Sequence, residues 1–221
     1  MPLLKFLTRL FSRSGEAQKA AGSTMKPDRL IVGLGNPGAK YRGTRHNAGY
    51  MVLAEFVKRE FLGKPSHKFH GDILEARVAG KNILFLCPTT FMNLSGQAVS
   101  EAMGFYKLDL SELLVVCDDV DLPVGRIRFR DSGGSGGQKG VKDIIARLGS
   151  EKFSRLRVGV GRPPAGVDTA DHVLSEFRSE EKDLIQDSVR RAADALTCWV
   201  EYGTEESANR FNGGSKSTGT E

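Results

Sequence analysis

Apolar residues follow two different spacings along the chain, and segments of the two kinds alternate. Short runs rich in Val, Ile and Leu, ended by glycine or charged residues, predict strands at 30–35, 112–119 and 155–161. The segment 126–130 (RIRFR) alternates strictly between basic and apolar residues, which predicts a further strand with one basic and one apolar face. The segment 72–88 predicts a β-hairpin that turns near Gly80, Lys81 and Asn82. Apolar residues at helical spacing predict helices at 47–61, 96–107, 140–149 and 180–202.

This order of elements predicts the fold class. Strands alternating with helices, together with one hairpin, indicate a single α/β domain with a mixed central β-sheet flanked by helices. We expect Thr44 to cap the first helix and Ser95 to open the second. In the closing helix we expect five residues to face the core: Leu184, Val189, Ala193, Leu196 and Val200.

The two ends of the chain differ in composition from the middle. We predict an N-terminal extension over 1–28, a folded domain over 29–212 and a disordered tail over 213–221. Residues 3–13 place leucines on one helical face and basic residues on the other, and 14–24 are small and polar. Three interpretations stay open: an organelle transit peptide, a flexible bacterial tail, or an upstream start codon before a true start at Met25.

Charge is distributed unevenly, which the net charge of +5 conceals. Residues 1–27 hold five basic residues and one acidic residue, so the remainder of the chain carries only +1. Within that remainder, 125–157 contains nine Lys or Arg residues against three acidic ones. A polyanion such as a phosphate backbone would therefore bind this local patch.

The cysteines and histidines do not predict a metal site. Cys87, Cys117 and Cys198 each lie in an apolar stretch, as buried free thiols do. The four histidines do not combine with them in a zinc spacing, and we expect His67 and His70 to be a solvated pair, even if they share a helix face. The longest apolar runs are far too short to cross a membrane.

The segment Gly33–Gly38 matches the dinucleotide-binding pattern G-x-G-x-x-G after a strand. In that motif a helix begins directly at the glycines, so that the pyrophosphate meets the helix N-terminus. Here Pro37 and the segment 40–43 delay the helix, and the nearest acidic residue, Glu55, falls within it. We therefore do not expect a nucleotide cofactor.

His46 follows a turn and lies apart from any apolar stripe, which makes it a candidate general base. Asp118 and Asp119 end a buried strand, where ligand sites of α/β sheets gather, and an aspartate there can orient the imidazole. No Ser or Cys has the context of a nucleophile, so the base would act on water. A capping or surface histidine is the alternative.

Two further features are candidates for substrate contacts. Asn36 and Asn93 each follow a strand, and their amides can hold a peptide backbone, although a turn-forming role is the alternative. The loop 132–140 (SGGSGGQKG) can bring backbone N–H groups and Lys139 to a phosphate, or it is merely flexible.

Several long motifs, in order from Leu30 to about Asn212, resemble the bacterial-type peptidyl-tRNA hydrolases. They are LIVGLGNPGAKYRGTRHNAGY (30–50), PTTFMNLSGQAV (88–99), DDVDLPVGRIRFR (118–130), GGSGGQKGVKDI (133–144) and FSRLRVGVGRP (153–163). The resemblance implies a compact α/β enzyme, active as a monomer in the cytoplasm on peptidyl-tRNA. It also implies that the enzyme needs no cofactor and no metal, and that it binds neither a membrane nor DNA. A mitochondrial or plastid location is the alternative if 1–24 is a transit peptide.

The resemblance also assigns roles to individual residues. It implies that His46 activates water, that Asp118 orients His46, and that Asn36 distinguishes blocked from free aminoacyl ends. It implies substrate contacts for Tyr41, Phe91 and Asn93. It implies tRNA contacts for Arg128 and Arg130, with Arg155 as a further candidate.

The chain departs from the family pattern at the end of the glycine-rich loop. The family has a His-Asn pair there, and this chain has Gln138 and Lys139. Gln138 can supply part of the lost amide role, and Lys139 can add a contact to RNA phosphate. A non-catalytic RNA-binding relative of the same fold is the competing interpretation, although His46, Asp118, Asn36 and Asn93 are all present.

Overall fold

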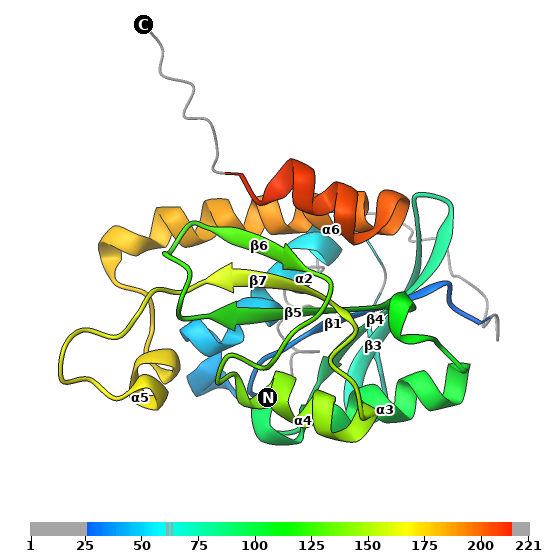
Figure 1. Ribbon diagram of the computed structural model, residues 1–221, viewed down its shortest axis with the longest axis horizontal. Helices are drawn as coiled ribbons and strands as arrows, with labels where there is room; N and C mark the ends of the chain where they lie inside the picture. Colours follow the sequence, from blue (N-terminus) through cyan, green and yellow to red (C-terminus); the bar gives the residue numbers. More distant parts are fainter. Residues whose placement is uncertain (1–25, 61, 63, 214–221) are drawn as a thin grey trace, which may run out of the picture.

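A seven-stranded mixed β-sheet forms the centre of the molecule in a computed structural model that describes residues 26–60, 62 and 64–213 (Figure 1). The strands are β1 (Arg29–Gly33), β2 (Ser66–Lys68), β3 (Gly71–Val78), β4 (Lys81–Pro88), β5 (Leu113–Asp119), β6 (Ile127–Arg130) and β7 (Ser154–Gly159). Their order is β2-β3-β4-β1-β5-β7-β6. The inner neighbours β4, β1, β5 and β7 pair in parallel, while β2, β3 and β6 pair antiparallel at the two edges. The expected mixed sheet is confirmed.

Helices cover both faces of this sheet (Figure 1). The helices are α2 (Ala48–Arg59), α3 (Ser95–Tyr106), α4 (Lys139–Leu148), α5 (Thr169–Leu174) and α6 (Lys182–Phe211). Five short 3-10 turns join them to the strands: η1 (Ala39–Tyr41), η2 (Arg45–Asn47), η3 (Met92–Leu94), η4 (Leu110–Glu112) and η5 (Ser179–Glu181). Side chains of α2 and α6 pack on one face, and those of α3 and α4 pack on the other.

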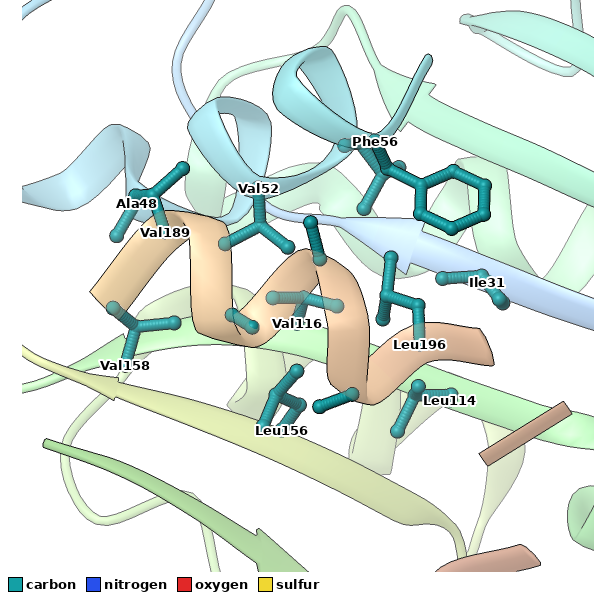
Figure 2. Close-up of a cluster of buried hydrophobic side chains, with 14 of the residues drawn as sticks. Ile31, Ala48, Val52, Phe56, Leu114, Val116, Leu156, Val158, Val189 and Leu196 are labelled. Carbon is teal, nitrogen blue, oxygen red and sulfur yellow. The ribbon is translucent and has the colours of Figure 1, made fainter. Parts of the chain in front are cut away.

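The pleat of the strands divides the core into two clusters. Ile31 of β1 joins the cluster under α2 and α6, whereas its neighbours Leu30 and Val32 join the cluster under α3 and α4. Figure 2 shows the first cluster, to which α6 contributes Leu196 and β5 contributes Val116. Each such side chain, when fully buried, contributes about 1.5–3 kcal/mol through the hydrophobic effect.

Helix α2 lies unusually close to the sheet because its second residue is Gly49. A Cβ atom at this position would lie 2.4 Å from both the Leu34 nitrogen and the Val116 carbonyl oxygen. The start of α2, and with it η2, is therefore held against the ends of β1 and β5.

The edge strand β6 is partly covered by the residue that follows α6. The Asn212 side chain accepts a hydrogen bond from the Phe129 N–H at 2.7 Å and donates one to the Phe129 carbonyl at 3.3 Å. Asn212 thus pairs with the backbone groups of β6 that its neighbour β7 leaves unpaired.

Several details differ from the sequence-based expectations. Leu184 is 51% exposed, and Ile185 faces the core in its place, because the inward stripe of α6 runs through Ile185, Val189 and Leu196. The helix also continues to Phe211 beyond a break at Gly203, whose φ is 81°. Thr44 precedes η2, but its hydroxyl donates to the Tyr41 carbonyl and caps nothing.

Other expectations fall outside the described residues or were incomplete. The sequence did not indicate β2 or α5, and the hairpin turns at Ala79 and Gly80, one residue before the expected position. The N-terminal extension is described only from Lys26, and the tail only at Gly213. No helix in the part of the chain that the structure describes is long and apolar enough to cross a membrane.

Candidate active site

A cavity of about 800 Å³ lies at the carboxyl ends of β1, β4 and β5. Ligand sites of parallel sheets form at such ends. The cavity is lined by all the predicted site residues except Arg128: Asn36, Tyr41, His46, Phe91, Asn93, Asp118, Arg130, Lys139 and Arg155. The fold therefore brings together residues that are up to 119 positions apart in the sequence (from Asn36 to Arg155).

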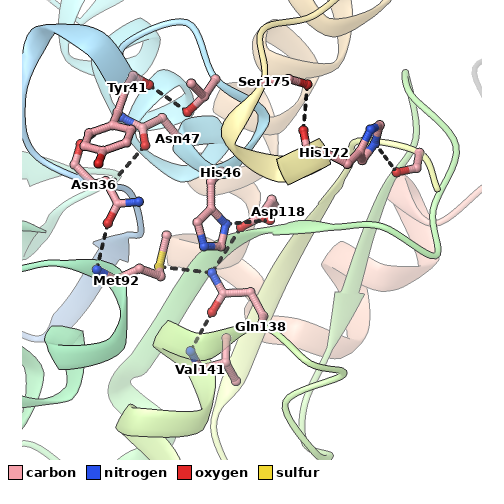
Figure 3. A network of polar contacts seen from close by, with 12 residues as sticks. Asn36, Tyr41, His46, Asn47, Met92, Asp118, Gln138, Val141, His172 and Ser175 are labelled. Carbon is pink, nitrogen blue, oxygen red and sulfur yellow. Dashed lines mark hydrogen bonds and ion pairs between the residues drawn. The ribbon is translucent and has the colours of Figure 1, made fainter. Parts of the chain in front are cut away.

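His46 and Asp118 form a hydrogen-bonded pair in the wall of this cavity (Figure 3). The His46 Nδ1 atom lies 2.9 Å from the Asp118 Oδ2 atom, and both residues are buried. His46 comes from η2 and Asp118 from the end of β5, so Gly49 sets their separation through the packing of α2. In the described part of the chain the His46 Nε2 atom has no hydrogen-bond partner, which leaves its lone pair for a bound molecule.

The turn that carries His46 is held from behind by Arg45, which is only 2% exposed. The Arg45 guanidinium donates to the Glu181 carboxylate at 2.7 Å and to the Val160 carbonyl at 3.3 Å, and it lies over the Phe177 ring. Burial raises the pKa of Glu181, but hydrogen bonds and charge from Arg45 and Arg178 outweigh it and lower the pKa below its ordinary value. This ion pair, buried on the Arg45 side and partly exposed at Glu181, ties η2 to the segment before α6.

Asn36 presents an amide whose orientation the protein fixes (Figure 3). Its Oδ1 atom accepts a hydrogen bond from the Met92 N–H at 2.8 Å, so its Nδ2 donor is directed elsewhere. Asn47 holds the Asn36 backbone on both sides, accepting from its N–H at 2.8 Å and donating to its carbonyl at 3.0 Å. Asn36 therefore offers a hydrogen-bond donor at the cavity, whereas Asn93 is exposed at its rim.

Cys117 also touches the cavity, but it is not equipped as a nucleophile. Burial raises the pKa of its thiol well above the usual range, and the carboxylates of Asp118 and Asp119 act in the same direction. A thiol of this kind stays protonated near neutral pH and is inert. Asp119 itself is paired with Arg157 of β7. As expected, Cys87, Cys117 and Cys198 are free and buried.

The departure from the family pattern lies at the N-terminus of α4. Gln138 is buried, and its Oε1 atom accepts a hydrogen bond from the Val141 N–H at 2.7 Å, which caps the helix. Its Nε2 atom lies 3.0 Å from the Asp118 Oδ1 atom and 3.1 Å from the Met92 sulfur (Figure 3). Lys139, the first residue of α4, is exposed at the cavity.

Arg155 occupies a different position from the one expected of an RNA contact. It is 4% exposed, and its guanidinium donates to the carbonyls of Gly133, Gly134 and Glu151. Burial lowers the pKa of this guanidinium from its ordinary value. Arg155 therefore holds the glycine-rich loop from below, and its donors are directed at the protein.

The basic residues of β6 face outward, as the alternation of the strand predicted. Ile127 and Phe129 are buried, while Arg128 and Arg130 are exposed. Arg130 reaches the cavity, and Arg128 lies outside it on the same strand. Arg130 and Lys139 thus each bring a positive charge to the cavity wall, which also carries the carboxylates of Asp131 and Asp168.

His67, His70 and the segment Gly33–Gly38 make contacts within the protein. No group of three His, Cys, Asp or Glu side chains is arranged to hold a metal within residues 26–60, 62 and 64–213. His67 and His70 lie in β2 and the turn after it, and not on a helix; they pair with Asp72 and Glu101. Within the G-x-G-x-x-G segment, a Cβ at Gly35 would collide with the Tyr50 ring, so this glycine serves packing.

Sequence reasoning missed some residues that shape the site. Asn47 stands next to His46 in the chain, but its double contact with Asn36 depends on the fold. The short helix α5 contributes Thr169, Val173 and Leu174 to the cavity wall. Asp168 caps α5 by accepting a hydrogen bond from the Ala170 N–H, and an aspartate at this place is a signal that could have indicated the helix.

Comparison with known proteins agrees with this geometry. Residues 30–219 match the family model for peptidyl-tRNA hydrolase. The peptidyl-tRNA hydrolase of Rhodopirellula baltica is 49% identical over 187 residues, which cover 85% of this chain and 98% of the relative. That of Syntrophomonas wolfei is 48% identical over 184 residues, covering 83% of this chain and all of the relative. The crystal structure of the Acinetobacter baumannii enzyme superposes with a TM-score of 0.79 at 33% identity and covers 86% of this chain and 97% of its own. With its fold, its cavity and its sequence in agreement, the chain belongs to the peptidyl-tRNA hydrolase family.

Proposed function

We propose that this chain hydrolyses the ester bond of peptidyl-tRNA, with His46 as the general base. The products are free tRNA and peptide, which recycles tRNA from stalled or aborted translation. The observation that carries the proposal is the His46–Asp118 pair, because its free Nε2 atom lies in the wall of the cavity. The non-catalytic alternative gains no support, since the groups needed for hydrolysis lie together.

Each proton has a place in the proposed reaction. Nε2 of His46 takes a proton from a water molecule as the oxygen attacks the ester carbonyl. The Asp118 carboxylate stabilises the imidazolium that forms and holds Nδ1 in its protonated state. When the tetrahedral intermediate collapses, the ester C–O bond breaks, and the imidazolium returns the proton to the departing ribose oxygen.

Selection of the substrate rests on the amide donors. The Nδ2 group of Asn36 donates hydrogen bonds, and so it suits a peptide carbonyl and offers no acceptor to a free α-ammonium group. We assign Asn93, Tyr41 and Phe91 to the rim that receives the peptide and the end of the tRNA. Phe91 is 58% exposed, which leaves its face open for stacking.

We assign tRNA binding to Arg128, Arg130 and Lys139. A cation in the first turn of a helix is disfavoured by the helix dipole, so Lys139 gains more from a phosphate than from α4 itself. We further propose that the chain acts as a monomer in the cytoplasm. The residues on which a targeting segment would depend, 1–24, lie outside the described part of the chain.

The test compares N-acetyl-aminoacyl-tRNA with free aminoacyl-tRNA, both in the presence of EDTA. We expect rapid release of the blocked amino acid only. His46→Ala should lower kcat by about 10²–10⁴, with tRNA binding little changed, and Asp118→Asn should cost less.

His67→Ala is a matched control for these variants. His67 also pairs with an aspartate, Asp72, but the pair lies outside the cavity and the His67 side chain is 61% exposed. The kcat of the His67→Ala enzyme should equal that of the wild type. Near-normal turnover in His46→Ala would require another base and would overturn the proposed mechanism.

A further inference from the structure

Gln138 connects the start of α4 to the catalytic pair (Figure 3). Its side-chain amide makes three contacts in a buried position: with the Val141 N–H, the Asp118 carboxylate and the Met92 sulfur. One end of the amide is thus fixed by the helix backbone, and the other end reaches the carboxylate that pairs with His46.

The surroundings of the amide decide which way it points. The Val141 N–H can only donate, so it must meet Oε1, and this turns Nε2 toward Asp118. The reverse orientation would place a carbonyl oxygen against a carboxylate and two N–H donors against an N–H donor. The hydrogen bond to Asp118 therefore follows from the helix cap.

The Asp118 carboxylate is consequently held at both oxygen atoms. Its Oδ2 atom meets His46 Nδ1 at 2.9 Å, and its Oδ1 atom meets Gln138 Nε2 at 3.0 Å. Rotation of the carboxylate would break both hydrogen bonds. From this geometry we propose that Gln138 is a positioning residue, which fixes Asp118 so that His46 presents Nε2 to water.

A neutral donor suits this position better than a cation does. The charged side chains that line the cavity around His46 and Asp118 are Asp119, Arg130, Asp131, Lys139, Arg155, Arg157 and Asp168. Arg157 pairs with Asp119, and Arg155 with loop carbonyls, so within the described residues Asp118 has no basic partner other than His46. The amide orients Asp118 without competing for its charge, which stays available to the imidazolium.

Two substitutions separate this role from helix capping. Gln138→Ser keeps the cap, because a serine hydroxyl accepts from the same N–H group, but it is too short to reach Asp118. Gln138→Met fills the space but loses the hydrogen bonds to the Val141 N–H and to the Asp118 carboxylate. This inference rests on the proposed function, so turnover is measured alongside NMR of the His46 ring, which does not depend on activity.

We expect Gln138→Ser to keep a thermal midpoint within about 5 °C of the wild type, whereas Gln138→Met loses more. In both variants kcat should fall about tenfold with KM unchanged. The Nδ1–H resonance of His46 should be visible in the wild type and should broaden or disappear in both variants. A Gln138→Ser enzyme with wild-type kcat, or with an unchanged Nδ1–H resonance, would overturn the inference. Failure of the wild type to hydrolyse its substrate would instead overturn the proposed function.

Discussion

The buried charge of Arg45 sits beside the proposed general base and has Glu181 as its carboxylate partner. The pKa of Glu181 is lower in the folded protein than its ordinary value, so the ionised form favours folding. This contribution is fully present above pH 4.5, the ordinary value, and it is lost as the pH falls through the lower folded value. Glu181→Gln should therefore lower the free energy of unfolding at pH 7 by about 2 kcal/mol. The difference from the wild type should shrink at about pH 3.5.

Urea unfolding at the two pH values measures this effect. Glu180→Gln is the control, since Glu180 is the exposed neighbour in the same 3-10 turn. It should change the free energy of unfolding by less than about 0.5 kcal/mol. A difference for Glu181→Gln that is the same at both pH values would show that the ion pair does not carry the stabilisation.

Single residues show how far the sequence reaches into the site. Residue type and place in the chain made His46, Asp118 and Asn36 candidates, but only the family resemblance assigned them roles. The structure brings all three to one cavity. The positions of Arg45 and Gln138 depend on partners 136 and 20 residues away, which no local pattern specifies. Arg155 was a further candidate for a tRNA contact, and in the structure its donors are directed at the carbonyls of the glycine-rich loop.

At the scale of elements, the close contact between α2 and the sheet depends on Gly49, which has no side chain. Gly49→Ala would place a methyl group against the Leu34 and Val116 backbone, which cannot move aside as a side chain can. We expect a loss of about 2–3 kcal/mol in the free energy of unfolding. Because η2 must shift with α2, kcat should fall as well.

Gly104→Ala provides the control for Gly49→Ala. Gly104 lies in α3, and an alanine Cβ atom at this position would have no neighbouring atom within 4 Å. Alanine there should raise stability by about 0.5–1 kcal/mol and leave kcat unchanged. Equal stabilities of the two variants would mean that α2 adapts more freely than its packing suggests.

The long elements of the fold could be predicted because their apolar spacing is imposed by the sheet. The alternation in β6 identified its buried and exposed residues, and the helical stripes located α3, α4 and most of α6. By contrast, β2 is three exposed residues long and α5 is six residues long, so neither buries enough to leave a pattern. The sequence analysis ended the last helix at 202, directly before Gly203, and glycine is a common residue at helix ends. In the structure Gly203 has a φ of 81°, but the helix resumes and Ser207 beyond it is buried.

At the scale of the whole molecule, the proposed tRNA surface depends on the exposed arginines of β6, of which Arg130 also lines the cavity. The double variant Arg128→Ala/Arg130→Ala removes two exposed cations from β6. It should weaken tRNA binding at low salt and reduce the slope of log K against log salt by about 1.5–2, as counterion release requires. The effect should appear in KM, with kcat within about twofold of the wild type.

Lys58→Ala/Lys64→Ala makes the same change in net charge elsewhere. Both lysines are exposed, and neither lies on β6 or in the wall of the cavity. For tRNA binding by this variant, the slope of log K against log salt should stay close to that of the wild type. If the two double variants weakened binding equally, net charge alone would account for the affinity, and the assignment to β6 would be wrong.

The pairing of Asn212 with β6 affects whether another chain can add a strand to this edge of the sheet. An edge strand with free N–H and C=O groups is a template on which a second chain can add a strand. Asn212 occupies both groups of Phe129, the middle of the exposed edge, while Arg128 and Arg130 on either side repel another copy of themselves. The strand proposed to contact tRNA can thus remain at the edge of the sheet without pairing with a strand of another copy.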